Sequence, residues 1–388
     1  MSAPVEIMNV PLRHATASTR GAKQSNEDRY VSVVDRFPGP VFGVFDGHGG
    51  VSAAKYLVRH LVQNVIYAVE AYIGHERVQD VAEVRSAYED DAMKLDQLTK
   101  KMEMEHCCLK NVGEWKQEVD GDDTEISEIE ADLRKVCNRL QAQVDEIASN
   151  EVKRDVHLHN FWSFIKNHFA STVRTTFHRT DEALLQALPS NDGSTAVLVW
   201  LIGHKPSDLT IYAANVGDSR AVLCRNGLAV PLTRDHTPDQ PDEMKRILKH
   251  GGAVAQFEGV ARVYSPGALQ KSTEPSVKKR LAMSRSFGDR PLKIPQECVT
   301  CEPEISHVNV TEDDWFLVIA TDGVWNALSN QEAVDIALQH FDDPKTAARA
   351  ILGEAYREGS LDNITATVVQ FAWQDDVKRA RHHVARQH

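Results

Sequence analysis

Short apolar runs bounded by turn residues fill the second half of the chain and limit its fold most strongly. TAVLVWLI, LTIYAANV, WFLVIA and NITATVVQF lie between residues 190 and 371. Each run is long enough for a buried strand. Asn226-Gly227 separates two further apolar runs and favours the tight turn of a β-hairpin. Strands joined by hairpins, with helices in separate runs, favour antiparallel sheets covered by helices over a doubly wound parallel sheet.

The N-terminal part of the chain repeats this pattern on a smaller scale. YVSVV and PVFGVF predict short strands within residues 28–73. A helix is predicted to start at about Ser52. Two glycines come before this serine, which suits a helix N-cap, and the apolar residues that follow it roughly track one helix face.

Residues 75–155 differ from both of these regions. The segment holds roughly 22 acidic and 12 basic side chains and carries most of the formal charge of −12. Apolar residues spaced three and four apart predict two helices, separated by a turn at 120–123 with Thr124 as a helix cap. We therefore expect an acidic, coiled-coil-like helical hairpin inserted into a globular domain; the alternative is a charged, partly disordered loop. The expected seam consists of Leu95, Leu98, Met102, Leu109 and Val112, and of Ile126, Ile129, Leu133, Val136, Leu140 and Ile147.

Composition narrows the class of protein. Of the 388 residues, 42% are hydrophobic and 26% charged, which supports a packed globular chain. The acidic balance makes nucleic acid an unlikely partner, since phosphate backbones select basic surfaces. No apolar run approaches the roughly 20 residues that span a bilayer, so we expect no membrane association. The start MSAPVEIMNV lacks the features of a secretory signal, and the six cysteines suit free thiols. We expect a cytoplasmic and/or nuclear protein.

Acidic residues stand where four predicted strands begin or end. Asp46 follows VFGVF, Asp322 follows WFLVIAT, Asp362 comes just before ITATVV, and Glu27-Asp28 come just before YVSVV. A sheet could project all of them to one rim. Carboxylates packed together repel unless cations neutralise them. Oxygen ligands without cysteine or clustered histidine select magnesium or manganese, and two such ions could activate a water toward an electrophile.

Six segments closely resemble, in order, the motifs of the metal-dependent protein serine/threonine phosphatases, the protein phosphatase 2C (PPM) family. The similarity covers about residues 16–73 and 156–371. It implies an α+β fold, a four-layer α-β-β-α sandwich of two antiparallel β-sheets flanked by helices. The segments are VFDGHGG at 44–50, DGSTA at 192–196, ANVGDSR at 214–220, LAMSRSFGD at 281–289, ATDGVW at 320–325 and SLDNIT at 360–365.

The resemblance implies a binuclear site with two Mg²⁺ or Mn²⁺ ions. Asp46 would bridge both ions, the Gly47 carbonyl would bind one, and Asp322 and Asp362 would bind the other. Glu27 and Asp28 would act through metal-bound waters. Asp192 is a candidate ligand for a third, weaker ion.

The same resemblance implies hydrolysis of phosphoserine and phosphothreonine in phosphoprotein substrates. A metal-bridging water would attack phosphorus, and His48 would protonate the departing oxygen. Lys23 stands where the family usually has a phosphate-binding arginine, and Asn326 replaces an acidic residue. Lysine lacks the planar fork of arginine, so we expect an active enzyme with weakened phosphate or metal affinity.

The predicted organisation has five parts. They are an N-terminal tail at 1–15, a catalytic domain at 16–373, the helical insertion at 75–155 within it, an enlarged flap at 264–280 and a basic tail at 374–388. A regulatory protein could bind the insertion or the flap. Two other functions compete with the phosphatase: a pseudophosphatase-like scaffold that grips a partner through the insertion, and a metal-dependent phosphodiesterase or nuclease, which suits an acidic protein poorly.

Overall fold

A computed structural model describes residues 12–118, 124–203, 205–268 and 280–372. The chain forms two compact units, one from residues 1–72 with 165–388 and the other from residues 73–164. The predicted turn at 120–123, most of the flap insertion and the basic tail lie outside the described residues.

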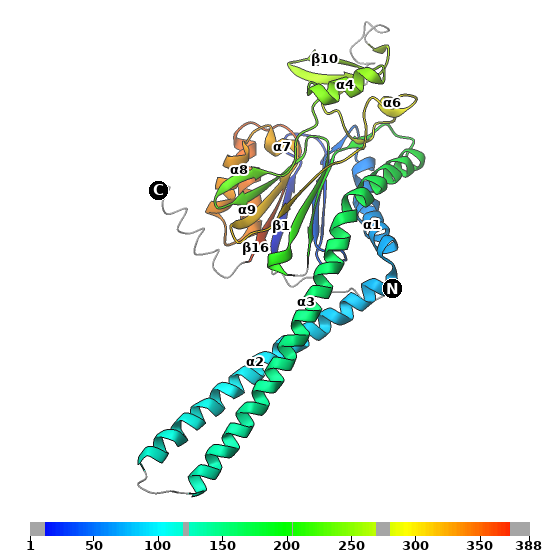
Figure 1. The fold of residues 1–388 in the computed structure, drawn as a ribbon. Helices are drawn as coiled ribbons and strands as arrows, with labels where there is room; N and C mark the ends of the chain where they lie inside the picture. Colours follow the sequence, from blue (N-terminus) through cyan, green and yellow to red (C-terminus); the bar gives the residue numbers. More distant parts are fainter. Residues whose placement is uncertain (1–11, 119–123, 204, 269–279, 373–388) are drawn as a thin grey trace. The chain divides into compact units, whose positions relative to one another are not determined.

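Two five-stranded sheets form the centre of the larger unit (Figure 1). All neighbouring strands within them are antiparallel, as the hairpin signals predict. The first sheet has the order β1 (Leu12–Thr19), β16 (Ile364–Phe371), β15 (Asp314–Ala320), β8 (Arg220–Arg225) and β9 (Leu228–Pro231). The second has the order β14 (Glu304–Asn309), β7 (Thr210–Val216), β6 (Ala196–Ile202), β3 (Val41–Phe45) and β2 (Arg29–Val33).

The two sheets pack against each other because their strands are apolar on both faces. In β15, Leu317 and Ile319 join the core between the sheets, whereas Phe316 and Val318 join a second core. Since successive side chains point to opposite faces, this division follows the period of two along the strand. Helices α8 (Asn330–Gln339) and α9 (Pro344–Arg357) supply the other side of that second core.

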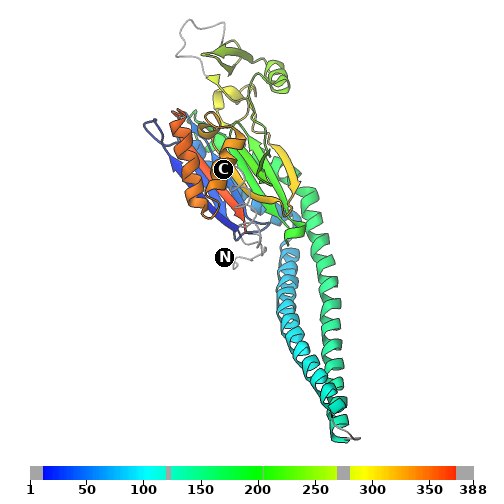
Figure 2. The ribbon, with the colours of Figure 1, turned by 90° about the vertical axis from the view of Figure 1, so that its left-hand side faces the viewer.

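A helical layer covers the outer face of the second sheet as well. Phe169 of α3 (Thr124–Ala187) packs edge-on against Trp200 and Tyr212, with ring centroids 5.3 and 5.0 Å apart. Helix α1 (Ser52–Ile73) lies beside α3 in this layer (Figures 1 and 2). The order of layers is therefore helix, sheet, sheet, helix, and the predicted α+β class is confirmed.

The charged insertion consists of two long helices. Helix α2 (His75–Glu118) runs antiparallel to the first part of α3 (Figure 1). Arg154 of α3 donates a hydrogen bond to the carbonyl of Ala87 at 3.0 Å and forms an ion pair with Asp91. On the predicted seam, Leu140 is buried but Ile129 is 43% exposed. Helix α3 continues well past residue 155, because residues 124–187 contain no glycine or proline to end it.

Two small sheets complete the larger unit. The sheet of β10 (Ala253–Phe257), β11 (Val260–Tyr264) and β12 (Arg280–Leu281) packs with helix α4 (Pro241–Lys249) through a core that includes Ile247 and Val263. The other contains three two-residue strands, β4 (Gly47–His48), β5 (Gly193–Ser194) and β13 (Phe287–Gly288). The small sheet of β4, β5 and β13 joins three segments that lie far apart in the sequence.

Two further expectations concern the described residues. No helix among them combines the length and the apolar character that a membrane crossing requires. All six cysteines fall within the described ranges and are unpaired, as the sequence predicts.

Candidate metal centre

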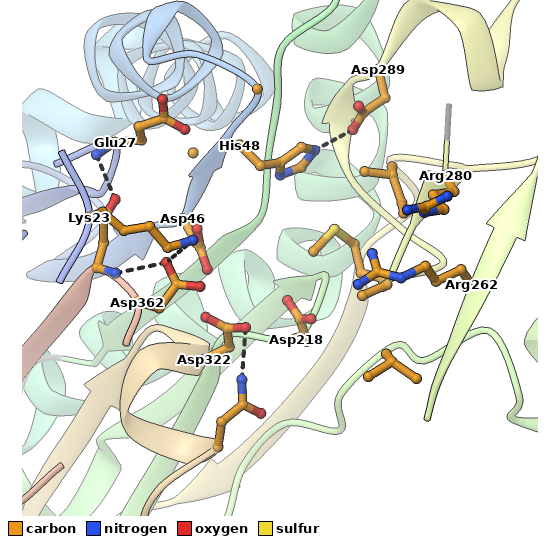
Figure 3. Close-up of a pocket in the computed structure, with 18 of the residues that line it drawn as sticks. Lys23, Glu27, Asp46, His48, Asp218, Arg262, Arg280, Asp289, Asp322 and Asp362 are labelled. Carbon is orange, nitrogen blue, oxygen red and sulfur yellow. Dashed lines mark hydrogen bonds and ion pairs between the residues drawn. The ribbon is translucent and has the colours of Figure 1, made fainter. Parts of the chain in front are cut away.

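Most of the predicted site residues line one cavity (Figure 3), but Asp28 and Asp192 are not among its lining residues. Asp46 follows β3, Asp322 begins the short helix α7 (Asp322–Trp325) directly after β15, and Asp362 precedes β16. These three aspartates line a cavity of about 800 Å³, and they share it with Lys23, Glu27, Gly47 and His48. Acidic residues at the ends of strands from both sheets therefore line the same cavity.

Three carboxylates at this rim lie close enough to share a cation. Asp46, Asp218 and Asp322 each offer an oxygen, and these oxygens lie within 4.8 Å of one another. Burial raises the pKa of Asp46 well above its usual value, and the charges of Asp322, Asp28 and Asp218 raise it further. Burial, with the charge of Asp322, raises the pKa of Asp218 to about 8. A group this crowded needs either protons or cations to balance its charge.

Asp28 is buried in the protein interior, where the charge of Asp322 acts on it. Its side chain is 3% exposed, and its Oδ2 accepts hydrogen bonds from the hydroxyls of Thr321 and Thr365 at 3.0 and 2.7 Å. Burial raises the pKa of Asp28 to about 7, although the two hydroxyls act to lower it. Its second oxygen, Oδ1, is buried without a hydrogen-bond partner among the described residues, as is Oδ1 of Asp218.

The two positions that depart from the family pattern both contact acidic residues of the site. Lys23 Nζ lies 3.0 Å from Asp362 Oδ1. Burial acts to lower the pKa of Lys23, but the hydrogen bond to Asp362 and the charges of nearby aspartates raise it. Asn326 Nδ2 donates to Asp322 Oδ2 at 3.0 Å. Asp362 thus has a cationic partner and lies outside the group of three close carboxylates.

His48 also lines the cavity and points toward an aspartate, Asp289 (Figure 3). Its Nε2 lies 2.7 Å from Oδ2 of Asp289, whose side chain is 1% exposed. The strand pairing of β4 with β5, and of β5 with β13, brings these two residues together across 241 positions of sequence.

Asp192 contacts a helix terminus. Its Oδ2 accepts a hydrogen bond from the backbone N–H of Ser52 at 3.0 Å, at the start of α1. Burial acts to raise the pKa of Asp192, but hydrogen bonds from Ser190 and Ser52 lower it. A role for Asp192 at a third ion stays a prediction.

Sequence reasoning missed two acidic residues of the site. Asp218 lies in the quoted ANVGDSR segment, between β7 (Thr210–Val216) and β8, and Asp289 ends the LAMSRSFGD segment. Gly-Asp-Ser looks like an ordinary turn in the sequence, so nothing local marks Asp218 as part of a metal site. Two arginines, Arg262 and Arg280, also line the cavity from β11 and β12.

Comparison with known proteins places the chain in a family. The model of the protein phosphatase 2C family matches residues 88–364. Probable protein phosphatase 2C 71 of Arabidopsis thaliana is 30% identical over 94% of this chain, which spans 56% of that relative's length. Probable protein phosphatase 2C 59 of the same plant is 30% identical over 94% of this chain and 81% of the relative.

Solved structures show the same fold. The crystal structure of serine-threonine phosphatase 2C from Toxoplasma gondii superposes with a TM-score of 0.61, at 22% identity, over 95% of this chain and 98% of that one. A Caenorhabditis elegans sex determining protein superposes with a TM-score of 0.59, at 19% identity, over 95% of this chain and 67% of that one. With the family match and the 30% identical relatives, the chain belongs to the protein phosphatase 2C family.

Proposed function

We propose that the protein hydrolyses phosphoserine and phosphothreonine in phosphoprotein substrates, with two Mg²⁺ or Mn²⁺ ions as cofactors. The observation that carries this proposal is the group of oxygens from Asp46, Asp218 and Asp322 within 4.8 Å of one another, in a cavity that also holds Lys23 and His48. Family membership supports a protein phosphatase.

The residues present fit hard divalent cations. The donors are carboxylate oxygens, and buried Oδ1 atoms of Asp28 and Asp218 lack partners within the described ranges. Asp46, Asp218 and Asp322 would hold the ions, with Asp362 and the Gly47 carbonyl added by family resemblance. When bound, the ions supply positive charge at the phosphate and lower the pKa of an attacking water.

Lys23 and His48 divide the remaining tasks. Lys23 carries a positive charge at the cavity wall, beside Asp362, where it can attract a phosphate oxygen. In the reaction, a bond forms between a water oxygen and phosphorus while the bond from phosphorus to the serine or threonine oxygen breaks. His48 gives a proton to that departing oxygen, so that it leaves as an alcohol.

The test is phosphate release from a phosphothreonine peptide with added manganese. We expect activity in the wild type and a loss of at least 100-fold in Asp46→Ala and Asp322→Ala, the loss typical when a group that stabilises developing charge is removed. Asp132→Ala is the matched control, because Asp132 is a 74% exposed aspartate on α3 in the other unit. Phosphate release that is unchanged in both Asp46→Ala and Asp322→Ala contradicts the proposal.

The scaffold hypothesis rests on Lys23 and Asn326 alone. A wild type without activity toward any of several phosphopeptides, but with retained binding to them, favours it. The regulatory partner at residues 75–155 or at the flap, and the cytoplasmic or nuclear location, stay predictions. Protein without residues 75–155, compared with the full chain in the same assay, tests whether the insertion regulates or recruits.

A further inference from the structure

We propose that Asp289 is the positioning residue for His48, and that a buried chain of contacts through Ser286, Lys293 and Asp181 holds Asp289 in place. This inference rests on the proposed function, because it gives the histidine of that reaction its support. It assigns tasks to four residues outside the metal cluster.

The contact between Asp289 and His48 is short and shielded from water. Asp289 Oδ2 lies 2.7 Å from His48 Nε2 and also accepts a hydrogen bond from the hydroxyl of Ser286 at 2.7 Å. Asp289 is 1% exposed and Ser286 is fully buried. A carboxylate bonded to one ring nitrogen fixes both the orientation and the tautomer of an imidazole. One oxygen thus ties His48 to the segment 286–289.

A buried ion pair anchors that segment to helix α3. Asp181 and Lys293 are 4% and 7% exposed and form an ion pair with each other. Lys293 Nζ also donates to the carbonyl of Ser286 at 2.7 Å, and the N–H of Gly288 donates to Asp181 Oδ1 at 2.7 Å. Buried charges persist only when paired and hydrogen-bonded, so this pair fixes the backbone at Ser286 and Gly288, just before Asp289.

The backbone conformation at Asp289 and the glycine at 193 together allow the contact with His48. Asp289 has a φ of 51°, in the left-handed region, and its N–H donates to the carbonyl of Asp192 at 3.1 Å. Such a conformation persists only where the surroundings impose it. A Cβ added to Gly193 would lie 2.0 Å from Asp289 Oδ2 and 2.4 Å from His48 Nε2. Only glycine at 193 leaves room for the pair.

A positioning role has a consequence that depends on the leaving group. The alkoxide of serine or threonine is a poor leaving group and needs a proton as its bond to phosphorus breaks. The p-nitrophenolate released from p-nitrophenyl phosphate is a far weaker base than a serine or threonine alkoxide, so it leaves without that proton. Losing the alignment of His48 must therefore slow peptide hydrolysis much more than p-nitrophenyl phosphate hydrolysis, whereas damage to the metal centre slows both.

The experiment measures kcat and KM for a phosphothreonine peptide and for p-nitrophenyl phosphate. In Asp289→Asn and Gly193→Ala we expect the peptide kcat to fall on the order of 100-fold with KM unchanged, and p-nitrophenyl phosphate kcat to stay within about threefold. In Ser286→Ala the peptide kcat should also fall more than the p-nitrophenyl phosphate kcat, but by a smaller factor. The matched control is Gly353→Ala in α9, where an added Cβ meets nothing within 4 Å.

Three results would overturn the proposal. They are an equal loss on both substrates, no loss on either, and a further loss when Asp289→Asn is added to His48→Ala, since residues that act as a unit are not additive. A second measurement needs no activity: in the neutral form of His48, the ring nitrogen NMR signals should place the proton on Nε2, which faces the Asp289 carboxylate, and this preference should be lost in Asp289→Asn. An unchanged tautomer in the variant contradicts positioning, whereas a wild type inactive on both substrates contradicts only the proposed function.

Discussion

Replacing Asp218 with asparagine should make the metal-free protein more stable and the metal-bound protein less stable. Asp218→Asn keeps the shape of the side chain and removes one charge from a group whose oxygens lie within 4.8 Å. Two unit charges at that separation repel by about 3 kcal/mol at an effective dielectric constant of about 20. Partial protonation of the cluster reduces this figure, so we expect the Tm of the metal-free protein to rise by several degrees.

The pH dependence of this effect has a definite sign. Burial raises the pKa of Asp218 from 3.8 to about 8 in the folded protein. Between these values the unfolded chain ionises this carboxyl while the folded, metal-free chain keeps it protonated, so stability is lost as pH rises. The advantage of Asp218→Asn over the wild type should therefore be absent at pH 4 and grow toward pH 8.

Manganese should make the wild type more stable than Asp218→Asn, the reverse of the order expected without metal. In Asp218→Asn a cation loses the attraction of one of its three carboxylates. An energy of even half the repulsion worked out above lowers the affinity for manganese by about tenfold. The assay is thermal unfolding in EDTA and across a manganese titration, with the 74% exposed Asp132→Asn as control. If Asp218→Asn unfolds below the wild type in EDTA, or if its manganese midpoint is unchanged, Asp218 is not part of the cation site.

Two further predictions concern the positions that depart from the family pattern. Lys23→Arg should lower the KM for a phosphopeptide several-fold with kcat nearly unchanged, because a guanidinium can bind two phosphate oxygens where Lys23 offers one charge; steady-state kinetics check this, and an unchanged or higher KM refutes it. Asn326→Asp should reduce the manganese concentration for half-maximal activity several-fold, since it adds a carboxylate 3.0 Å from Asp322; an activity titration that shifts the other way contradicts the reasoning.

Local sequence patterns predicted most of the sheets and the acidic rim. Strand β15 could be recognised because its apolar run has strand length and ends at Asp322. The β8–β9 hairpin could be recognised because Asn226 and Gly227 suit positive φ, and both adopt it, at 51° and 80°. Each of these signals lies within a few neighbouring residues.

The remainder depended on contacts between distant segments. Helix α3 extends past residue 155 because one unbroken helical sequence joins the charged seam to residues such as Phe169 that pack on a sheet. The contact between Asp289 and His48 spans 241 positions, and the pair of Lys293 with Asp181 spans 112. Period and turn chemistry do not report such pairings, since many partners of the same type are available along the chain.

Strand β16 has a consequence for how the protein is made. It lies between β1 and β15 in the first sheet, and its register pairs Leu12 with Phe371 and Thr19 with Ile364. At roughly 5–20 residues per second, a ribosome takes about 20 to 70 seconds to make the residues that separate β1 from this partner. During that time β1 has no neighbour in its sheet and can pair with other chains. Nascent protein therefore needs protection from aggregation, and any product that stops before residue 364 leaves both β1 and β15 without their common partner.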